Sequence, residues 1–126
     1  MKEVKTIFKQ VCEGVRELHR ASTVHGDLKT SNILISKQGN VVIADLGSAS
    51  LVESKTRGVK AVTTLLYRAP EQLFGPSLVE NPFSMDVWSL GCIFGELLLG
   101  RPLFYFCHDA REYARALAAN FQGDFL

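Results

Sequence analysis

One segment limits the possible folds of this chain more than any other. The run from Val87 to Gly100 is apolar at nearly every position and contains a single charged residue, Glu96. A helix that is apolar nearly all round must be covered by other parts of the protein, so we predict a central buried helix with the remaining elements packed around it. The run is also too short to cross a bilayer, and we expect no membrane partner.

The residues around this run mark the ends of the helix. Ser84 is the predicted N-cap, because a serine hydroxyl can accept a hydrogen bond from the first turn, and Asp86 adds a favourable negative charge there. At the other end, Gly100 suits the left-handed conformation that ends many helices, and Pro102 cannot continue the helix. These signals predict a helix from Ser84 to Leu99.

Hydrophobic spacing predicts the surrounding elements. Between Val4 and Arg20, apolar residues recur every three or four positions with charged residues between them, which indicates an amphipathic helix. Ile33–Ile35 and Val41–Ala44 are two β-rich runs joined by a turn-forming segment, and we expect them to pair as a hairpin. The other expected elements are a surface loop over 45–60, a short helix after Pro70, and a helix over 109–120 that has Tyr113, Ala116, Leu117 and Phe121 on one face.

Composition and charge exclude several kinds of partner. The 126 residues are 47% hydrophobic, with 14 basic and 13 acidic side chains and a net charge of +1. This is a globular composition, sufficient for one domain. The near-neutral charge argues against a nucleic-acid partner. The three cysteines lack both CxxC pairing and zinc-ligand spacing, so we expect them to be reduced, in the cytoplasm or the nucleus.

The residues that carry chemistry flank the predicted hairpin. His25-Gly26-Asp27-Leu28-Lys29-Thr30-Ser31-Asn32 precedes it, and Asp45-Leu46-Gly47 follows it. The two ends of a hairpin lie side by side, so two acids, a lysine and an amide should converge on one small site. Phosphoryl transfer needs these residue types: a carboxylate for the hydroxyl proton, oxygen ligands for Mg²⁺, and a cation near the phosphoryl group.

These motifs resemble those of eukaryotic protein kinases. The first is similar to their catalytic loop, usually His-Arg-Asp-Leu-Lys-x-x-Asn, and the second to their Asp-Phe-Gly metal motif. Two further stretches follow in the family's order: 64–71 resembles the end of the activation segment with its Ala-Pro-Glu motif, and 86–91 resembles the start of the long central helix. The residues within these motifs are most similar to those of serine/threonine kinases of the cyclin-dependent-kinase-like subgroup, and the resemblance covers about residues 4 to 104.

The resemblance implies a catalytic role for three residues. Asp27 would be the catalytic base and Lys29 the cation that contacts the phosphate. Thr64 would hydrogen-bond the catalytic loop and help to form the platform for a protein substrate that bears serine or threonine. The cofactors implied are ATP and Mg²⁺, with Asn32 and Asp45 as the metal ligands.

The same resemblance implies supporting roles for the neighbouring residues. Asp86 would hold the backbone of the catalytic loop from below. His25 and Leu46 would belong to an internal hydrophobic stack of the lobe. The floor beneath the adenine would consist of Ile33, Leu34 and Ile35.

The sequence departs from the family pattern inside the catalytic loop. Gly26 stands where most kinases have an arginine, which pairs with a phosphate added to the activation segment. The position of the usual phosphorylated threonine falls on Val59 or nearby. The arginine that would bind the phosphate and the threonine that would carry it are therefore lost together. We expect that phosphorylation at that position does not switch any activity.

A larger departure concerns the nucleotide clamp. The sequence contains no Gly-x-Gly-x-x-Gly loop and no Val-Ala-Ile-Lys-like lysine. The resemblance therefore implies a mainly α fold with short β-hairpins, like a kinase C-terminal lobe with the N-terminal lobe absent. We assign 1–104 to a partial kinase domain and 105–126 to a divergent tail. Because the clamp positions the triphosphate, we expect this chain alone to be weak or inactive.

Three hypotheses about function follow. The first is a serine/threonine kinase domain fragment that carries out ATP- and Mg²⁺-dependent phosphoryl transfer. The second is a non-catalytic, pseudokinase-like module that binds a kinase-family or regulatory protein. The third is a truncated gene product with marginal folding. The sequence alone does not decide among them, because ancestry is not activity.

Overall fold

The computed structural model describes residues 1–52, 64–74 and 80–120, and these residues form a mainly helical fold with two small antiparallel strand pairs. The fold class predicted from the sequence is therefore confirmed. Short 3₁₀ turns cover Thr30–Asn32, Leu46–Ser48 and Leu65–Tyr67. The helices and strands are, in chain order, α1 (Lys2–Arg20), β1 (Thr23–Val24), β2 (Ile33–Ile35), β3 (Val41–Ile43), β4 (Ser50–Leu51), α2 (Pro70–Phe74), α3 (Phe83–Leu99) and α4 (Ala110–Asn120).

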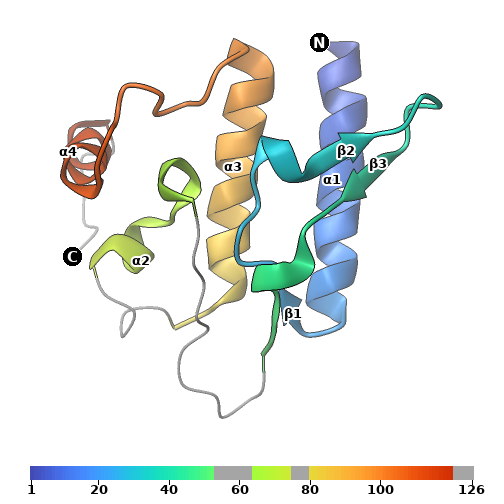
Figure 1. The fold of residues 1–126 in the computed structure, drawn as a ribbon, viewed down its shortest axis with the longest axis horizontal. Coiled ribbons are helices and arrows are strands. Elements are labelled where there is room, and N and C mark those ends of the chain that lie inside the picture. Colours follow the sequence, from blue (N-terminus) through green and yellow to red (C-terminus); the bar gives the residue numbers. More distant parts are fainter. Residues whose placement is uncertain (53–63, 75–79, 121–126) are drawn as a thin grey trace.

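Helix α3 lies at the centre of the described structure. Figure 1 shows α1 antiparallel to α3 on one side, with α2 and α4 on the other. The amphipathic pattern of α1 places Val11 and Val15 in the core, and α3 contributes Cys92 and Ile93. One face of α3 departs from the prediction of burial all round, because Val87 is 59% exposed. Within the described residues the helix is central but is not covered on every side.

The start of α3 differs from the prediction in its cap. The helix begins at Phe83, and Pro82 is its N-cap residue. Ser84 lies inside the first turn, where its hydroxyl donates to the Asn81 carbonyl at 2.6 Å and to the Glu71 carboxylate at 3.1 Å. A serine near the start of a helix can either cap the helix or donate to a preceding carbonyl, and the sequence alone does not distinguish the two.

The end of α3 follows the prediction. Gly100 has φ +75°, in the left-handed region that favours glycine, and its N–H donates to the Glu96 carbonyl at 2.8 Å.

Two strand pairs flank the segment His25–Asn32. The predicted hairpin forms, with Ile33 opposite Ile43 and Ile35 opposite Val41. The second pair, β1 with β4, places two residues of the predicted 45–60 surface loop in a sheet, because Val24 lies opposite Ser50. Strands of two residues carry no alternating pattern, so only their tertiary pairing identifies them.

Helix α4 packs onto the same core. Tyr113 and Leu117 are fully buried, as the pattern over 109–120 predicted, whereas Phe121 lies outside the described residues. The Tyr113 hydroxyl donates to the Arg68 carbonyl at 2.7 Å and accepts from the Trp88 indole at 3.2 Å. The three cysteines are free. No helix in the described part of the chain is long and apolar enough to span a membrane.

Candidate active site

The β2–β3 hairpin brings the two motifs together. Asn32 directly precedes β2, and one residue separates Asp45 from the end of β3, so the antiparallel pairing sets them at the same end of the hairpin. The Ala44 N–H donates to the Asn32 carbonyl at 2.8 Å, which extends the ladder to this end. The convergence predicted from the hairpin is therefore present.

A buried carboxylate holds the segment His25–Asn32 from below. Asp86 is 1% exposed and accepts hydrogen bonds from the backbone N–H groups of His25 at 2.8 Å and Gly26 at 3.0 Å. Gly26 has φ +84°, which glycine adopts without strain. The buried His25 ring accepts from the Asp27 N–H at 3.1 Å through Nδ1 and donates to the Ala44 carbonyl at 3.0 Å through Nε2. The loop is thus held both by α3 and by the end of β3.

Asp27, Lys29 and Thr64 form one connected cluster. Asp27 Oδ1 accepts from the Thr64 N–H at 2.9 Å and from the Thr64 hydroxyl at 2.8 Å. Lys29 Nζ donates to Thr64 Oγ1 at 3.0 Å and lies 3.4 Å from Asp27 Oδ2. Asp27 is mostly buried and Lys29 is partly exposed. Thr64 orients Asp27 through one oxygen, so Oδ2 is the atom available to a substrate proton.

Asn32 and Asp45 offer two oxygen ligands. The Asn32 amide donates to the Asp27 carbonyl at 2.9 Å, which leaves its Oδ1 as the atom that could bind a cation. Asp45 is exposed and has φ +59°, and its Oδ1 accepts from the Gly47 N–H at 3.3 Å. Mg²⁺ is commonly held by one or two protein oxygens together with substrate phosphates, and this pair fits that pattern.

Among the residues that the structure describes, no group of three or more histidines, cysteines, aspartates or glutamates could hold a metal ion.

The expected adenine floor and hydrophobic stack are only partly buried. Leu34 and Ile35 are about half exposed, and successive strand residues point to opposite faces, so Ile33 and Ile35 share a face that Leu34 does not. Leu46 is 54% exposed, unlike His25, which is fully buried. The expectation that Leu46 joins an internal stack is therefore wrong for the described residues, where little packs over the turn that carries it.

The structure also reveals a polar cluster that the sequence analysis did not assign to the site. The Thr30 hydroxyl donates to Glu96 Oε1 at 2.9 Å, and the Tyr67 hydroxyl donates to Glu96 Oε2. Burial, followed by the hydrogen bond to Glu96, raises the pKa of Tyr67 to about 12. The available signal was Glu96 itself, the one charged residue in the apolar run from Val87 to Gly100.

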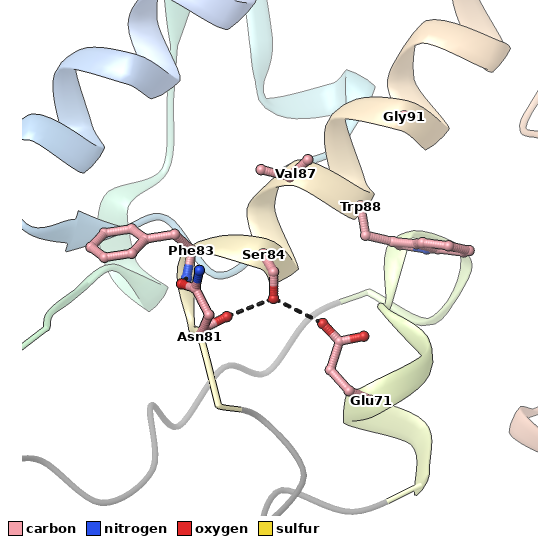
Figure 2. Close-up of a pocket in the computed structure, with 7 residues that line it drawn as sticks. All are labelled: Glu71, Asn81, Phe83, Ser84, Val87, Trp88 and Gly91. Carbon is pink, nitrogen blue, oxygen red and sulfur yellow. Dashed lines mark hydrogen bonds between the residues drawn. The ribbon is translucent and has the colours of Figure 1, made fainter. Parts of the chain in front are cut away.

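A pocket of about 510 Å³ lies beside α3, apart from the cluster of Asp27, Lys29 and Thr64. Figure 2 shows Glu71 of α2 reaching toward the Ser84 hydroxyl, with the Trp88 ring above α2 and Val87 on the opposite side of the helix. None of Asp27, Lys29 and Thr64 lines this pocket. The pocket therefore does not extend that cluster.

Known proteins resemble this chain over most of its length. The model of the protein kinase domain matches residues 1–123. The chain is 42% identical over 127 residues to serine/threonine-protein kinase SSN3 of Mycosarcoma maydis, an alignment that covers 98% of this chain and 17% of the relative. It is 47% identical over 103 residues to cyclin-dependent kinase 11B of Homo sapiens, which covers 81% of this chain and 13% of the relative.

A solved structure shares the fold. The crystal structure of the yeast RNA Pol II CTD kinase CTDK-1 complex contains a chain that matches with a TM-score of 0.84 and 34% identity, over 92% of this chain and 37% of that one. The present chain spans between 13% and 31% of the length of four of the curated relatives that it matches. The similarity therefore applies to one part of those proteins.

Proposed function

We propose that this chain, which belongs to the protein kinase family, supplies the catalytic loop for ATP- and Mg²⁺-dependent phosphoryl transfer to serine or threonine of a protein substrate. The family rests on the match to the protein kinase domain over residues 1–123. The observation that carries the proposal is the cluster in which Thr64 holds Asp27 Oδ1 while Lys29 lies beside Oδ2.

The cluster suits the transfer step. Asp27 Oδ2 would accept the proton of the substrate hydroxyl as its oxygen bonds to the γ-phosphorus and the bond to ADP breaks. The positive charge of Lys29 lies beside Asp27 Oδ2, where it would offset the negative charge of the transferred phosphoryl group. Thr64 fixes the carboxylate, so the base needs no rotamer search before it acts.

Asn32 and Asp45 would hold Mg²⁺, which when bound supplies positive charge at the phosphate oxygens. Asn32 is buried and its amide donates to the Asp27 carbonyl, which holds the Asn32 ligand oxygen at a fixed position relative to Asp27. Asp45 is exposed and free to meet a metal-nucleotide that arrives from solvent. Ile33, Leu34 and Ile35 of β2 would form the floor beneath the adenine.

Nucleotide binding gives the first test. Mg²⁺-ATP is titrated against the purified chain while its thermal unfolding midpoint is followed, because a ligand that binds only the native state must raise that midpoint. We expect an upward shift that Asp45→Asn greatly reduces and that Asp109→Asn, on a remote surface, leaves unchanged. A chain that unfolds cooperatively without any shift would contradict nucleotide binding and favour the non-catalytic interaction module.

Transfer itself is tested with radiolabelled γ-phosphate and a serine/threonine-rich protein acceptor. We expect slow but measurable labelling that Asp27→Asn reduces at least about a hundredfold, the usual size of a general-base contribution. Labelling that is equal in the unmodified chain and in Asp27→Asn would contradict the assignment of Asp27 as the base.

A further inference from the structure

Glu96 joins three segments that are far apart in the sequence. It lies on α3, and its two carboxylate oxygens accept from Thr30 of the catalytic loop and from Tyr67, which follows Thr64 by three residues. The Thr30 and Tyr67 hydroxyls also lie 3.3 Å from each other. Helix α3 holds the same tyrosine a second time, because the Ser89 hydroxyl donates to the Tyr67 carbonyl at 2.8 Å.

Placing the Glu96 carboxylate in an apolar helix costs free energy, because a partly buried charge loses contact with water. Glu96 occupies a half-buried position in the most apolar segment of the chain, and the ion pairs found among the described residues include none to it. Its charge is instead compensated by two hydroxyl donors, and hydrogen bonds to a carboxylate are stronger than neutral ones. Its charge also contributes, after burial, to the raised pKa of the neighbouring Cys92 thiol.

The two segments that Glu96 holds are the two that make the catalytic cluster. Thr30 follows Lys29 directly, and Tyr67 ends the 3₁₀ turn that begins after Thr64. The two segments are also bonded directly, from Thr64 to Asp27 and from Lys29 to Thr64. These direct bonds therefore lie beside the bonds that Glu96 accepts from each segment. A shift of either segment along the other would break both sets of bonds together.

We propose that Glu96 is a positioning residue, which sets the register between the catalytic loop and the segment after Thr64 by binding Thr30 and Tyr67 at once. As far as it concerns catalysis, this inference rests on the proposed kinase function, but the register itself is a property of the fold. Glu96 does not touch the reacting atoms; it acts through Thr64 on the orientation of Asp27.

Amide hydrogen exchange at Thr64 tests the register without any activity. In the unmodified chain the Thr64 N–H is bound to Asp27 Oδ1, so it should exchange slowly. We expect Glu96→Ala to speed its exchange at least about tenfold relative to the amide of Ile93, a buried α3 residue that reports global unfolding. Glu96→Gln keeps an acceptor for Thr30 and a donor for the Tyr67 oxygen, and it should restore exchange to within about threefold.

Matched variants keep the test decisive. Thr30→Val and Tyr67→Phe each remove one hydroxyl and report on the register even where Glu96→Ala does not fold; each should give a smaller increase in Thr64 exchange. Glu112→Ala, an exposed carboxylate on α4, should leave Thr64 unchanged. Thr64 exchange that follows the Ile93 amide in every variant would overturn the proposal, because Glu96 would then serve global stability alone.

The kinetic readout separates the register from the reaction. With Glu96→Ala we expect kcat for phosphoryl transfer to fall at least about tenfold while KM for ATP stays the same, with recovery in Glu96→Gln. An unmodified chain that transfers no phosphoryl group would contradict the proposed function, whereas the exchange experiment would still decide the role of Glu96. A kcat that Glu96→Ala leaves unchanged would overturn its part in catalysis.

Discussion

At the scale of single residues, the carboxylates of this chain differ in role because they differ in surroundings. Asp86 is buried and accepts from two backbone N–H groups and from His19, so it organises the loop and faces no solvent. Asp27 keeps one oxygen for Thr64 and the other beside Lys29. Asp45 is exposed at the end of the hairpin. The same functional group thus serves as a structural acceptor, a candidate base and a candidate metal ligand.

Replacing the buried acceptor tests this division of roles. Asp86→Asn turns one of the oxygens toward Gly26 or His25 into an N–H₂ donor, so a backbone donor loses its acceptor in a dry site. We expect the free energy of unfolding to fall by about 2 to 3 kcal/mol in urea titrations. Asp109→Asn is the matched control: this exposed residue caps α4 through Oδ1, which asparagine retains, and the change should stay within about 0.5 kcal/mol.

The Tyr67 phenol predicts a loss of stability at alkaline pH. Its pKa is raised from 10.0 to about 12 by burial and by Glu96, so the folded state favours the neutral phenol. This contribution, roughly 2 to 3 kcal/mol, is complete below pH 10 and is lost as the pH rises to about 12. We expect Tyr67→Phe to make the fall in unfolding free energy between pH 10 and 12 shallower. Parallel curves for the two proteins would show that Tyr67 does not titrate differently in the folded state.

At the scale of elements, α3 shows how local backbone preference and packing act separately. Gly91 lies in the middle of the helix on its exposed side, and Gly100 ends the helix with φ +75°. An added Cβ would meet no atom within 4 Å at either position. Any difference between substitutions at these two glycines therefore comes from the backbone and not from steric contact.

This pair of glycines predicts opposite effects of one mutation. Gly91→Ala should raise the free energy of unfolding by about 0.5 to 1 kcal/mol, because alanine loses less backbone entropy in a helix. Gly100→Ala should lower it by about 1 kcal/mol, because alanine pays to enter the left-handed region. Thermal unfolding of both variants checks the prediction, and a change of the same sign in both would contradict it.

At the scale of the whole molecule, α4 and the Phe104 region share the core of α3. The Phe104 and Tyr113 rings meet edge to face with centroids 5.0 Å apart, and both residues are buried. Tyr113 also bonds to Arg68 and Trp88, which belong to the part assigned from the sequence to the kinase domain. The division into 1–104 and 105–126 stays a prediction, and it can be tested through α4.

Leu117→Ala removes a fully buried side chain of α4 and should cost about 3 kcal/mol of unfolding free energy. If α4 is part of one cooperative unit, the transition of the entire chain shifts to lower urea, whether it is followed by circular dichroism or by the fluorescence of Trp88. Arg115→Ala, exposed on the same helix, should change it by less than about 0.5 kcal/mol. A variant in which only the helical signal shifts would support a separate tail.

Local patterns in the sequence were enough to predict α1, the hairpin, α2, α3 and α4, because each depends on periodicity or on glycine and proline near its own ends. The convergence of Asp27, Lys29, Asn32 and Asp45 also followed, since one hairpin joins their two motifs. The contacts of Thr64 and Asp86 with the catalytic loop were expected from the family resemblance, and the structure contains both.

Tertiary structure alone decided the remaining features. The β1–β4 pair, the backward hydrogen bonds of Ser84, the exposure of Leu46 and the meeting of Thr30 with Glu96 all depend on partners between 3 and 66 residues away or on what covers a surface. A residue's type limits the hydrogen bonds it can make, but the partner is chosen by the packing of whole elements, here by α3 against the catalytic loop. For this reason the sequence by itself determined the local elements and the candidate catalytic residues, and the packed fold determined how those residues are held.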